Sequence, residues 1–324
     1  MATAAPSAPG AARDDATGPP GGNGSTGRTG NPRPGWRGKE TRAALVFVAP
    51  AMLGFLVFFA WPTLRGLYLS FTDYDLLTSA DFSGLDNYRR LLEDDVFWNS
   101  LWVTLKYVLI NIGVQTFAAL LLAVLIHRLT RSVVLRGIIL LPYLISNVVV
   151  ALLWYWMADY NLGIINEVLG WVGFDPVAFF GDESWAIPTI ALVNVWRHLG
   201  YTALLIFAGL QTINRDVYEA AAVDGAGEVR IFFRITLPLL RPVMALVLVL
   251  TVIGSWQIFD TVAVTTQGGP VDATRVVQYY IFDQAFNRFD FGYASAVSVV
   301  LFLILAGVAL AQLKLLRAGE SDQS

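Results

Sequence analysis

Residues 214–238 read NRDVYEAAAVDGAGEVRIFFRITLP, and this stretch decides how the rest of the chain is interpreted. Asn214 or Asp216 can cap the N-terminus of a helix, and the alanine-rich sequence that follows has high helix propensity. Gly225 and Gly227 predict that this first helix ends or bends there. A second short helix is expected over residues 228–236, ending before Pro238, because proline disfavours helical conformation in the residue that precedes it.

Long apolar segments flank this polar stretch on both sides. The 324 residues are 56% hydrophobic and only 15% charged, whereas soluble domains carry about 25% charged residues. Six segments are long enough to cross a hydrocarbon core of about 30 Å as helices, the structure that satisfies all backbone groups within one segment. They lie at about residues 43–61, 107–126, 137–157, 186–209, 243–259 and 293–313. The chain is therefore expected to be an all-α membrane protein with six transmembrane helices.

The two ends of the chain differ from this region in composition. The first 36 residues contain eight Gly and six Pro, and such a segment buries too little apolar surface to offset its chain entropy. We expect a disordered tail over 1–42, a six-helix transmembrane domain over 43–317 and a short tail over 318–324. Both tails are expected to be cytoplasmic.

The charges indicate the orientation of the spans. With a cytoplasmic N-terminus, the inner segments 1–42, 127–136, 211–241 and 314–324 hold fifteen Lys and Arg residues, and the outer segments 62–99, 158–185 and 260–292 hold five. Cytoplasmic loops are the ones enriched in Lys and Arg. The bias therefore predicts a multi-pass membrane protein with residues 211–241 on the cytoplasmic side, and the family resemblance given below implies the bacterial inner or plasma membrane.

Composition also excludes several classes of function. The chain has no Cys and two His, which argues against thiolate chemistry and a His-rich metal site. A net charge of −3 gives no indication of nucleic-acid binding. The phosphate-binding pattern Gly-x4-Gly-Lys-Ser/Thr is absent from the sequence. We expect a chain that is not an enzyme and binds no cofactor.

The polar stretch resembles the EAA loop of importer-type ABC permeases. Glu-Ala-Ala at 219–221 is followed after two residues by Asp-Gly-Ala at 224–226, and after eight more by Ile-Thr-Leu-Pro at 235–238. Thr-Gln-Gly-Gly-Pro at 266–270 and Gly-Tyr-Ala-Ser-Ala at 292–296 also fit the carbohydrate-uptake branch of this family. The resemblance implies the type I importer fold in its minimal six-span form, with residues 211–241 as the coupling loop.

It further implies a set of partners and contacts. The chain would pair with a second, different EAA-loop permease, two cytoplasmic ATPase subunits and an extracytoplasmic solute-binding protein, and it would carry a sugar across the lipid bilayer. ATP would be hydrolysed by the partner subunits, and this chain would form half of the pathway. The residues implied to contact the ATPase are Glu219, Ala220, Ala221, Asp224, Gly225 and Ala226.

Polar residues within the fourth and fifth spans are candidates for the pathway, because polar groups in a membrane face a pore or another helix. Comparison with a relative in the family suggests the same two helices. The candidates are Asn194, His198, Tyr201, Thr251, Ser255 and Gln257. The alternative for them is hydrogen bonding between helices. For Arg197, pairing with the partner permease and attraction of an anionic solute both remain open.

Three other functions are alternatives to a sugar permease. One is an ABC permease for a non-sugar solute such as glycerol phosphate. Another is a secondary transporter, which predicts internal inverted repeats and broken spans; neither is apparent in the sequence. The third is a membrane-embedded enzyme, which needs a reactive cluster at one depth, whereas the two histidines lie on different segments.

Overall fold

The computed structural model describes residues 34–129 and 132–318. The chain divides into two compact units, residues 1–59 and residues 60–324. In the first unit, α1 spans Pro34–Phe55 and runs into η1, a π-helical turn over Leu56–Ala60. Residues 34–42 are thus helical where disorder was expected, and proline at the first helical position is favourable because its missing N–H has no partner there anyway. Residues 1–33 and 319–324 of the expected tails lie outside the described residues.

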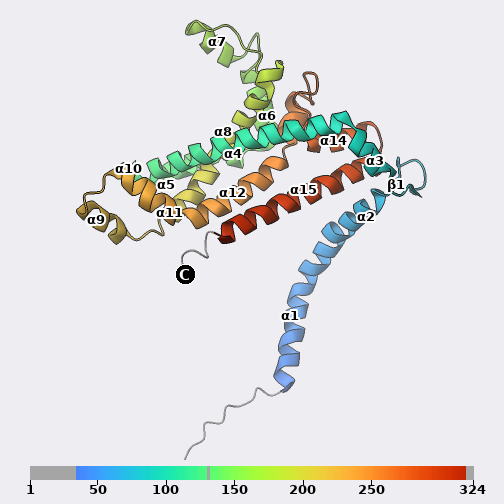
Figure 1. Cartoon of the computed structure of the whole chain (residues 1–324), viewed down its shortest axis with the longest axis horizontal. Coiled ribbons are helices and arrows are strands. Elements are labelled where there is room, and N and C mark those ends of the chain that lie inside the picture. Colours follow the sequence, from blue (N-terminus) through green and yellow to red (C-terminus); the bar gives the residue numbers. More distant parts are fainter. Residues whose placement is uncertain (1–33, 130–131, 319–324) are drawn as a thin grey trace, which may run out of the picture. The chain divides into compact units, whose positions relative to one another are not determined.

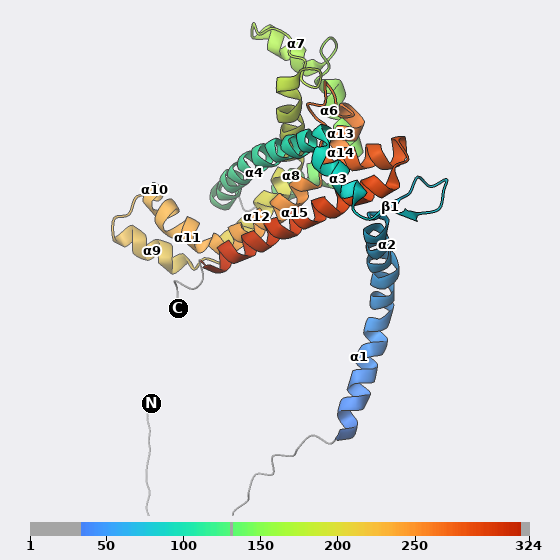
Figure 2. The ribbon, with the colours of Figure 1, turned by 45° about the vertical axis from the view of Figure 1, so that its right-hand side comes forward.

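Four long helices organise the second unit (Figures 1 and 2). Helices α4 and α8 pack along each other, and α12 contacts α4, α8 and α15. Their bounds are Asp95–Leu129 for α4, Glu183–Leu210 for α8, Arg241–Trp256 for α12 and Phe291–Ala318 for α15. Within the described residues, five helices are long and apolar enough to cross a membrane, or six if one bent pair is a single span. Among them is the 26-residue Ala44–Leu69 helix, which ends with α2 (Trp61–Leu69).

The bent pair is the segment expected as one span over residues 137–157. The structure divides it into α5 (Val133–Leu144) and α6 (Asn147–Met157), bent by 89°. Ile145 and Ser146 have extended backbone between the two helices. The expectation of an unbroken helix was wrong, and so was the expectation that no span is broken. Pro142, which lacks a backbone N–H, lies in the last turn of α5, and Ser146 occupies the N-cap position of α6.

A second interruption lies after α12. Residues Gln257–Phe259 leave the helical conformation, and α13 (Asp260–Thr265) then continues the apolar segment. Helix α13 packs against α6. In a membrane, the backbone groups that each interruption leaves unpaired need other partners.

Short elements lie at the end of the bundle opposite α9. The strands β1 (Thr72–Asp73) and β2 (Asp81–Phe82) pair antiparallel, with Thr72 opposite Phe82. Asn87 donates hydrogen bonds to the carbonyl groups of Ser70 and Thr72, which holds this ladder to the following helix. The other short elements are α3 (Asp86–Glu93), α14 (Val277–Phe282) and η3 (Asp283–Asn287). Helix α7 (Ile164–Trp171) lies apart from them, beyond α6 at the top of Figure 1.

The loop between α8 and α12 contains α9 (Arg215–Val223), α10 (Glu228–Ile231), η2 (Phe232–Thr236) and α11 (Leu237–Leu239). The expected end of the second helix before Pro238 was wrong, because helical turns continue through Leu239. The preceding turn is π-helical, and the Leu237 amide bonds back to the Phe232 carbonyl. A widened turn of this kind accommodates a proline ring that a regular α-helical turn would not.

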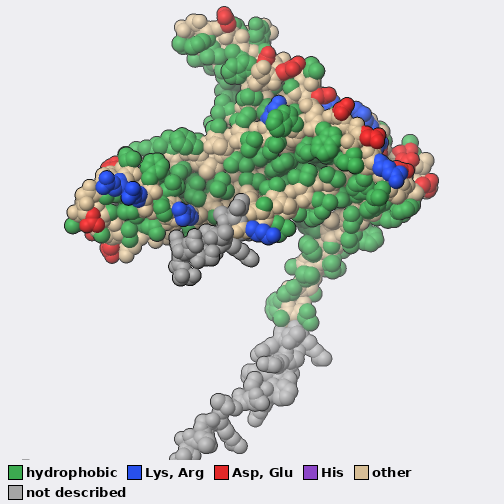
Figure 3. Space-filling model, in the orientation of Figure 1, with side chains coloured by type: hydrophobic (Ala, Val, Ile, Leu, Met, Phe, Trp, Pro, Cys, Tyr) green, Lys and Arg blue, Asp and Glu red, His purple; other side chains and the backbone are tan. Residues whose placement is uncertain are grey.

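Two clusters of buried apolar side chains hold the bundle together. One contains Tyr107, Ile190 and Trp256, and the other contains Ala119, Ile206 and Val247. In α4, α8 and α12 alike, polar residues separate the members of the first cluster from those of the second. On the side of the molecule that Figure 3 shows, side chains along the middle of the bundle are mainly hydrophobic, and most charged side chains lie toward its ends. The polar residues between the clusters form the site described next.

Candidate functional site

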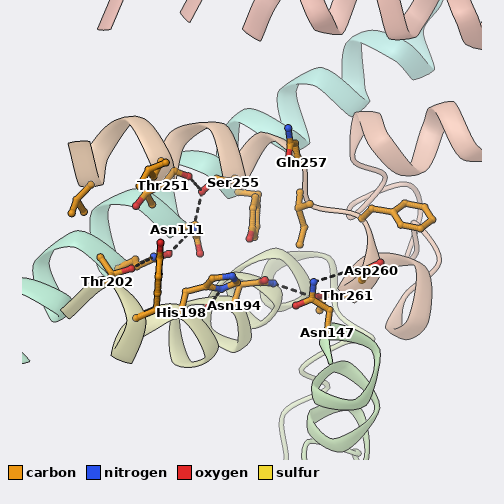
Figure 4. A pocket seen from close by; sticks show the side chains of 18 of the residues that line it. Asn111, Asn147, Asn194, His198, Thr202, Thr251, Ser255, Gln257, Asp260 and Thr261 are labelled. Atoms are coloured by element: carbon orange, nitrogen blue, oxygen red, sulfur yellow. Dashed lines mark hydrogen bonds between the residues drawn. The ribbon is translucent and has the colours of Figure 1, made fainter. Parts of the chain in front are cut away.

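A cavity of about 260 Å³ lies between the two apolar clusters. All six residues expected to line the pathway border it: Asn194, His198, Tyr201, Thr251, Ser255 and Gln257. They come from α8, α12 and the residues that follow α12. Figure 4 shows Asn194 and His198 of α8 across one space from Thr251 and Ser255 of α12. Helical spacing of three and four residues places the α8 members on one face.

Helix α4 adds polar residues that the sequence reasoning missed. The Asn111 amide donates to Ser255 Oγ at 2.8 Å and to Gln115 Oε1 at 3.1 Å, and Gln115 donates to Thr202 Oγ1 at 2.8 Å. This chain of hydrogen bonds joins α4 to α12 and α8 at the cavity (Figure 4). The signal that would have found it is a pair of amides four residues apart in an apolar span, on one helical face.

The network leaves one acceptor without a partner. Asn111 is 4% exposed, and its Oδ1 atom accepts no hydrogen bond within the described part of the chain. Buried polar atoms are almost always hydrogen-bonded, to protein or to ordered water. This oxygen can therefore accept a hydrogen bond from water or from a solute in the cavity.

The two helix interruptions meet at the same cavity. Asn147, the first residue of α6, donates to Asp260 Oδ2 at 2.8 Å, and Asp260 is the first residue of α13. Beside this pair, Asn194 donates to Thr261 Oγ1 at 3.1 Å. Figure 4 shows both bonds on one side of the cavity. Asn147 and Asp260 thus tie together the N-termini of two half-length helices.

Arg197 does not line the cavity, although it lies between cavity residues in the sequence. Its guanidinium donates to the carbonyl groups of Tyr143 and Ile145, at the end of α5. Neither alternative left open for this residue describes these contacts. Among the described residues, no group of three or more His, Asp or Glu side chains is placed to hold a metal ion.

The α9 loop is the second candidate region. Asn214 caps α9 by accepting from the Asp216 amide at 3.1 Å. At the other end, the Ala226 amide donates to the Ala221 carbonyl and the Gly225 amide to the Ala222 carbonyl. This is a Schellman motif, whose C′ position favours glycine because its φ is positive; Gly225 has φ +75°. The expected helix end at this glycine is confirmed.

The residues expected to contact a partner differ in accessibility. Glu219, Ala220, Asp224 and Gly225 are exposed, Ala226 is half-buried and Ala221 is buried within the chain. Glu219 pairs with Arg215 at 3.1 Å, and both side chains are exposed. The expectation that all the alanines form an open contact surface was therefore wrong for Ala221, which packs inward because it lies on the inner face of α9.

Apolar side chains extend this exposed surface. Val223, Val229 and Phe233 are exposed by 88%, 72% and 61%. Exposed apolar side chains grouped on one loop are typical of a protein contact. An ion pair joins the loop to the bundle, where Arg128 of α4 pairs with Glu228 at 2.7 Å. Within the loop, Thr236 donates to the Tyr218 hydroxyl at 3.3 Å.

A third polar cluster joins α3, α4, α14 and α15. The Asp94 carboxylate accepts hydrogen bonds from the hydroxyls of Tyr280 and Tyr293, and from the amides of Val96 and Phe97. Partial burial opposes ionisation of Asp94, but these donors together lower the pKa of its carboxyl. Burial and the Asp94 carboxylate together raise the pKa of Tyr280 to about 12. The cluster is a joint between four helices at the end opposite α9.

The chain is similar in sequence to permeases of known transport systems. Residues 115–316 match the family "Binding-protein-dependent transport system inner membrane component". The chain is 35% identical to the sulfoquinovosyl glycerol transport system permease of Agrobacterium fabrum, over 85% of this chain and 90% of the relative. It is 33% identical to the trehalose/maltose transport system permease of Thermococcus litoralis, over 85% and 94%. It is 34% identical to the sn-glycerol-3-phosphate transport system permease of Salmonella typhimurium, over 83% and 92%.

The fold is also found among solved structures. A bacterial ABC transporter involved in import of the acidic polysaccharide alginate superimposes with a TM-score of 0.78, at 24% identity, over 87% of this chain and 98% of that chain. The family match covers more than half of the sequence, and the relatives cover most of it. The chain therefore belongs to the family of binding-protein-dependent transport system inner membrane components, and it is a multi-pass, non-catalytic membrane subunit of an ABC importer.

Proposed function

We propose that this chain forms half of the translocation pathway for a carbohydrate and that the 260 Å³ cavity is part of that pathway. The observation that carries the proposal is the lining of the cavity. Amide and hydroxyl groups from five helices converge there, and the Tyr201 ring lies among them. Amides and hydroxyls exchange hydrogen bonds with sugar hydroxyl groups, and an aromatic ring packs against the apolar face of a sugar.

The relatives support a sugar or a sugar-like polyol. Their names refer to sulfoquinovosyl glycerol, to trehalose and maltose, and to sn-glycerol 3-phosphate. The first two are carbohydrates or carbohydrate derivatives, and the third is the alternative of a non-sugar solute. A di- or oligosaccharide, or a related glycoside, is the class that the cavity lining and these relatives favour together.

The proposal extends to how transport is coupled. The exposed residues of α9 and its Schellman end would dock on a cytoplasmic ATPase: Glu219, Ala220, Asp224, Gly225 and Ala226. ATP binding would move this loop and the bundle attached to it between two packed arrangements. The complete importer would contain a second, different permease, two ATPase subunits and an extracytoplasmic binding protein. The Lys and Arg bias supports cytoplasmic positions for the loop and for both termini.

Reconstitution of the complete importer in proteoliposomes tests the function. Uptake of radiolabelled trehalose, maltose, sulfoquinovosyl glycerol and sn-glycerol 3-phosphate would be measured with and without ATP inside the vesicles. We expect ATP-dependent uptake of one of the sugars. Uptake that does not depend on ATP would favour a secondary transporter, and uptake of glycerol phosphate alone would favour the non-sugar alternative.

Charge reversal tests the coupling surface. Glu219→Lys should leave the amount of assembled importer unchanged and abolish ATP-driven uptake. The control is Glu93→Lys, which reverses an exposed acid on α3, far from α9 along the bundle. Normal uptake by Glu219→Lys would remove this residue from the ATPase contact.

A further inference from the structure

Arg197 is a cation within a candidate membrane span, and its contacts lie inside the chain. Nε donates to the Ile145 carbonyl at 3.1 Å, and Nη2 donates to the carbonyls of Ile145 at 2.9 Å and Tyr143 at 3.0 Å. These carbonyls belong to the last turn of α5, where the helix is interrupted and has no further amides to offer. The guanidinium therefore takes the place of the missing turn of helix.

These hydrogen bonds offset two free-energy costs at once, that of a cation within the membrane and that of unpaired carbonyl groups. An arginine at the centre of a transmembrane helix is costly to place in the bilayer. Carbonyl groups left unpaired within the membrane are also costly. Guanidinium groups donate in a fixed planar fork, and here that fork meets the carbonyl end of α5, which carries partial negative charge.

The same guanidinium determines the state of His198. Nη1 lies 3.1 Å from His198 Nε2, and an arginine can only donate. Nε2 must therefore be the unprotonated nitrogen, and Nδ1–H donates to the Asn194 carbonyl at 3.0 Å. Arg197 thus holds His198, which lines the cavity, as a neutral imidazole in one tautomer and one orientation.

Arg197 also supports the aromatic side of the cavity. The guanidinium carbon lies 5.3 Å from the centre of the Tyr143 ring, in a cation–π contact. Tyr143 in turn stacks on Tyr201, with ring centroids 4.5 Å apart and planes at 11°. Tyr201 borders the cavity and Tyr143 does not. Through this stack, Arg197 fixes the plane of the ring that faces the cavity.

We propose that Arg197 is a positioning residue of the pathway: it closes the end of α5 and, through His198 and the Tyr143–Tyr201 stack, holds in place two side chains that meet the solute. Four of its five N–H groups are directed at the chain's own atoms, so it is not a binding site for an anionic solute. The inference rests on the proposed function in one respect, that the cavity carries the solute.

The first test measures the His198 ring and requires no transported solute. ¹⁵N solid-state NMR of histidine-labelled importer in liposomes reports which ring nitrogen carries the proton. The chain contains only His127 and His198, so subtracting the spectrum of His198→Gln isolates the His198 signals. We expect the neutral Nδ1–H tautomer in the wild type, and a mixture of states in Arg197→Gln, since Nε2 loses its donor. An Nε2–H tautomer in the wild type, or identical His198 signals in Arg197→Gln, would overturn the proposal.

The second test measures coupling between the two residues. The test uses the solute that the wild type takes up from the labelled panel of trehalose, maltose, sulfoquinovosyl glycerol and sn-glycerol 3-phosphate. We expect Arg197→Gln to reduce kcat/KM for its uptake by about tenfold or more, mainly through KM. Residues in one hydrogen-bond network give non-additive effects. Arg197→Gln/His198→Gln should therefore lose little more than the worse single variant. If the fold losses of the two single variants multiply in the double variant, Arg197 does not act through His198.

Two further variants separate positioning from folding. Arg197→Lys keeps the charge with a single donor group and should show an intermediate loss, whereas loss of assembly by both Arg197 variants would assign the residue to folding. Arg89→Gln, which removes an exposed arginine paired only with exposed Asp86, should leave uptake unchanged. Absence of uptake of every panel solute by the wild type would overturn the carbohydrate function, while the NMR result still decides the role of Arg197 at His198.

Discussion

At the residue scale, the cavity depends on polar side chains whose partners lie far away in the sequence. The Asn147 amide meets the Asp260 carboxylate 113 residues later, at 2.8 Å. Each of these residues begins a half-length helix, so their hydrogen bond sets where the two helix starts lie relative to each other. Side-chain hydrogen bonds between membrane helices contribute about 0.6–2 kcal/mol each.

A reciprocal exchange tests this bond. Asn147→Asp places two carboxylates against each other and should reduce the stability and uptake of the importer strongly. Asn147→Asp/Asp260→Asn restores one carboxylate and one amide and should recover most of the loss. The measurements are thermal stability of the assembled complex by size-exclusion chromatography, and uptake in vesicles. If the double variant is no better than Asn147→Asp, the bond does not join the two helices.

Close packing at a single glycine gives a second prediction at this scale. A Cβ atom at position 200 would lie 2.0 Å from the Ile139 carbonyl oxygen, where α8 meets α5. Gly200→Ala should therefore push these helices apart and destabilise the complex by about 1–3 kcal/mol, as overpacked cores do. Gly113→Ala in α4 is the matched control, because nothing lies within 4 Å of the added Cβ. Equal melting temperatures for the two variants would contradict the close approach.

At the element scale, the α9 loop has a shape determined by its own sequence. The Asn214 cap and the Schellman end at Gly225 satisfy the groups that a short helix leaves unpaired at its ends. Tyr218 and Thr236 bond within the loop, and Arg128–Glu228 joins the loop to the bundle. A short helix with both ends capped and an ion pair to α4 is suited to transmit displacement to the bundle as a rigid piece.

At Gly225 the effect of backbone strain can be measured separately from that of steric crowding. The φ angle is +75°, and nothing lies within 4 Å of an added Cβ. Gly225→Val should therefore reduce ATP-driven uptake through backbone strain, at a cost of about 1–2 kcal/mol for the left-handed conformation. Gly225→Asn should retain most activity, since asparagine tolerates this region. Uptake in proteoliposomes compares the two, and equal activities would show that the positive φ is not required.

At the scale of the whole molecule, the polar joint around Asp94 connects four helices at the end opposite α9. Arg90 extends it by donating to Asp290 at 2.6 Å and by lying over the Tyr293 ring at 4.0 Å. The pKa of Asp94 is lowered in the folded chain because its hydrogen-bond donors outweigh the opposing effect of partial burial. A lowered folded-state pKa adds stability above the unfolded-state pKa, and this contribution is lost as the pH falls through the folded-state value.

This sign gives a prediction about acid stability. An unfolded aspartate has a pKa of about 3.9, so the wild-type complex should lose this contribution progressively below about pH 4. Asp94→Asn should be less stable than the wild type at pH 7, and the difference should shrink as the pH falls below 4. Thermal melts from pH 3 to pH 7 measure it. A difference that stays constant over this range would show that ionisation of Asp94 does not stabilise the joint.

The sequence by itself determined the features that neighbouring residues encode. Hydropathy located the apolar segments, and Asn214, the alanines and Gly225 predicted a capped helix that the structure confirms. Such features depend on backbone groups within about one helical turn, so nearby residue types are enough to predict them. The family resemblance rested on the same local spacing and was confirmed by the comparisons.

Only the tertiary structure decided where the helices break and which polar groups meet. The segment 137–157 is apolar apart from Ser146 and Asn147. Its break at Ile145 is stable because Arg197, more than fifty residues away, donates to the carbonyls of Tyr143 and Ile145. Asn111 and Gln115 likewise acquire a role only because α4 packs beside α8 and α12. Hydropathy is averaged within one segment, whereas these contacts depend on how several segments pack in space. That packing determines where the cavity lies.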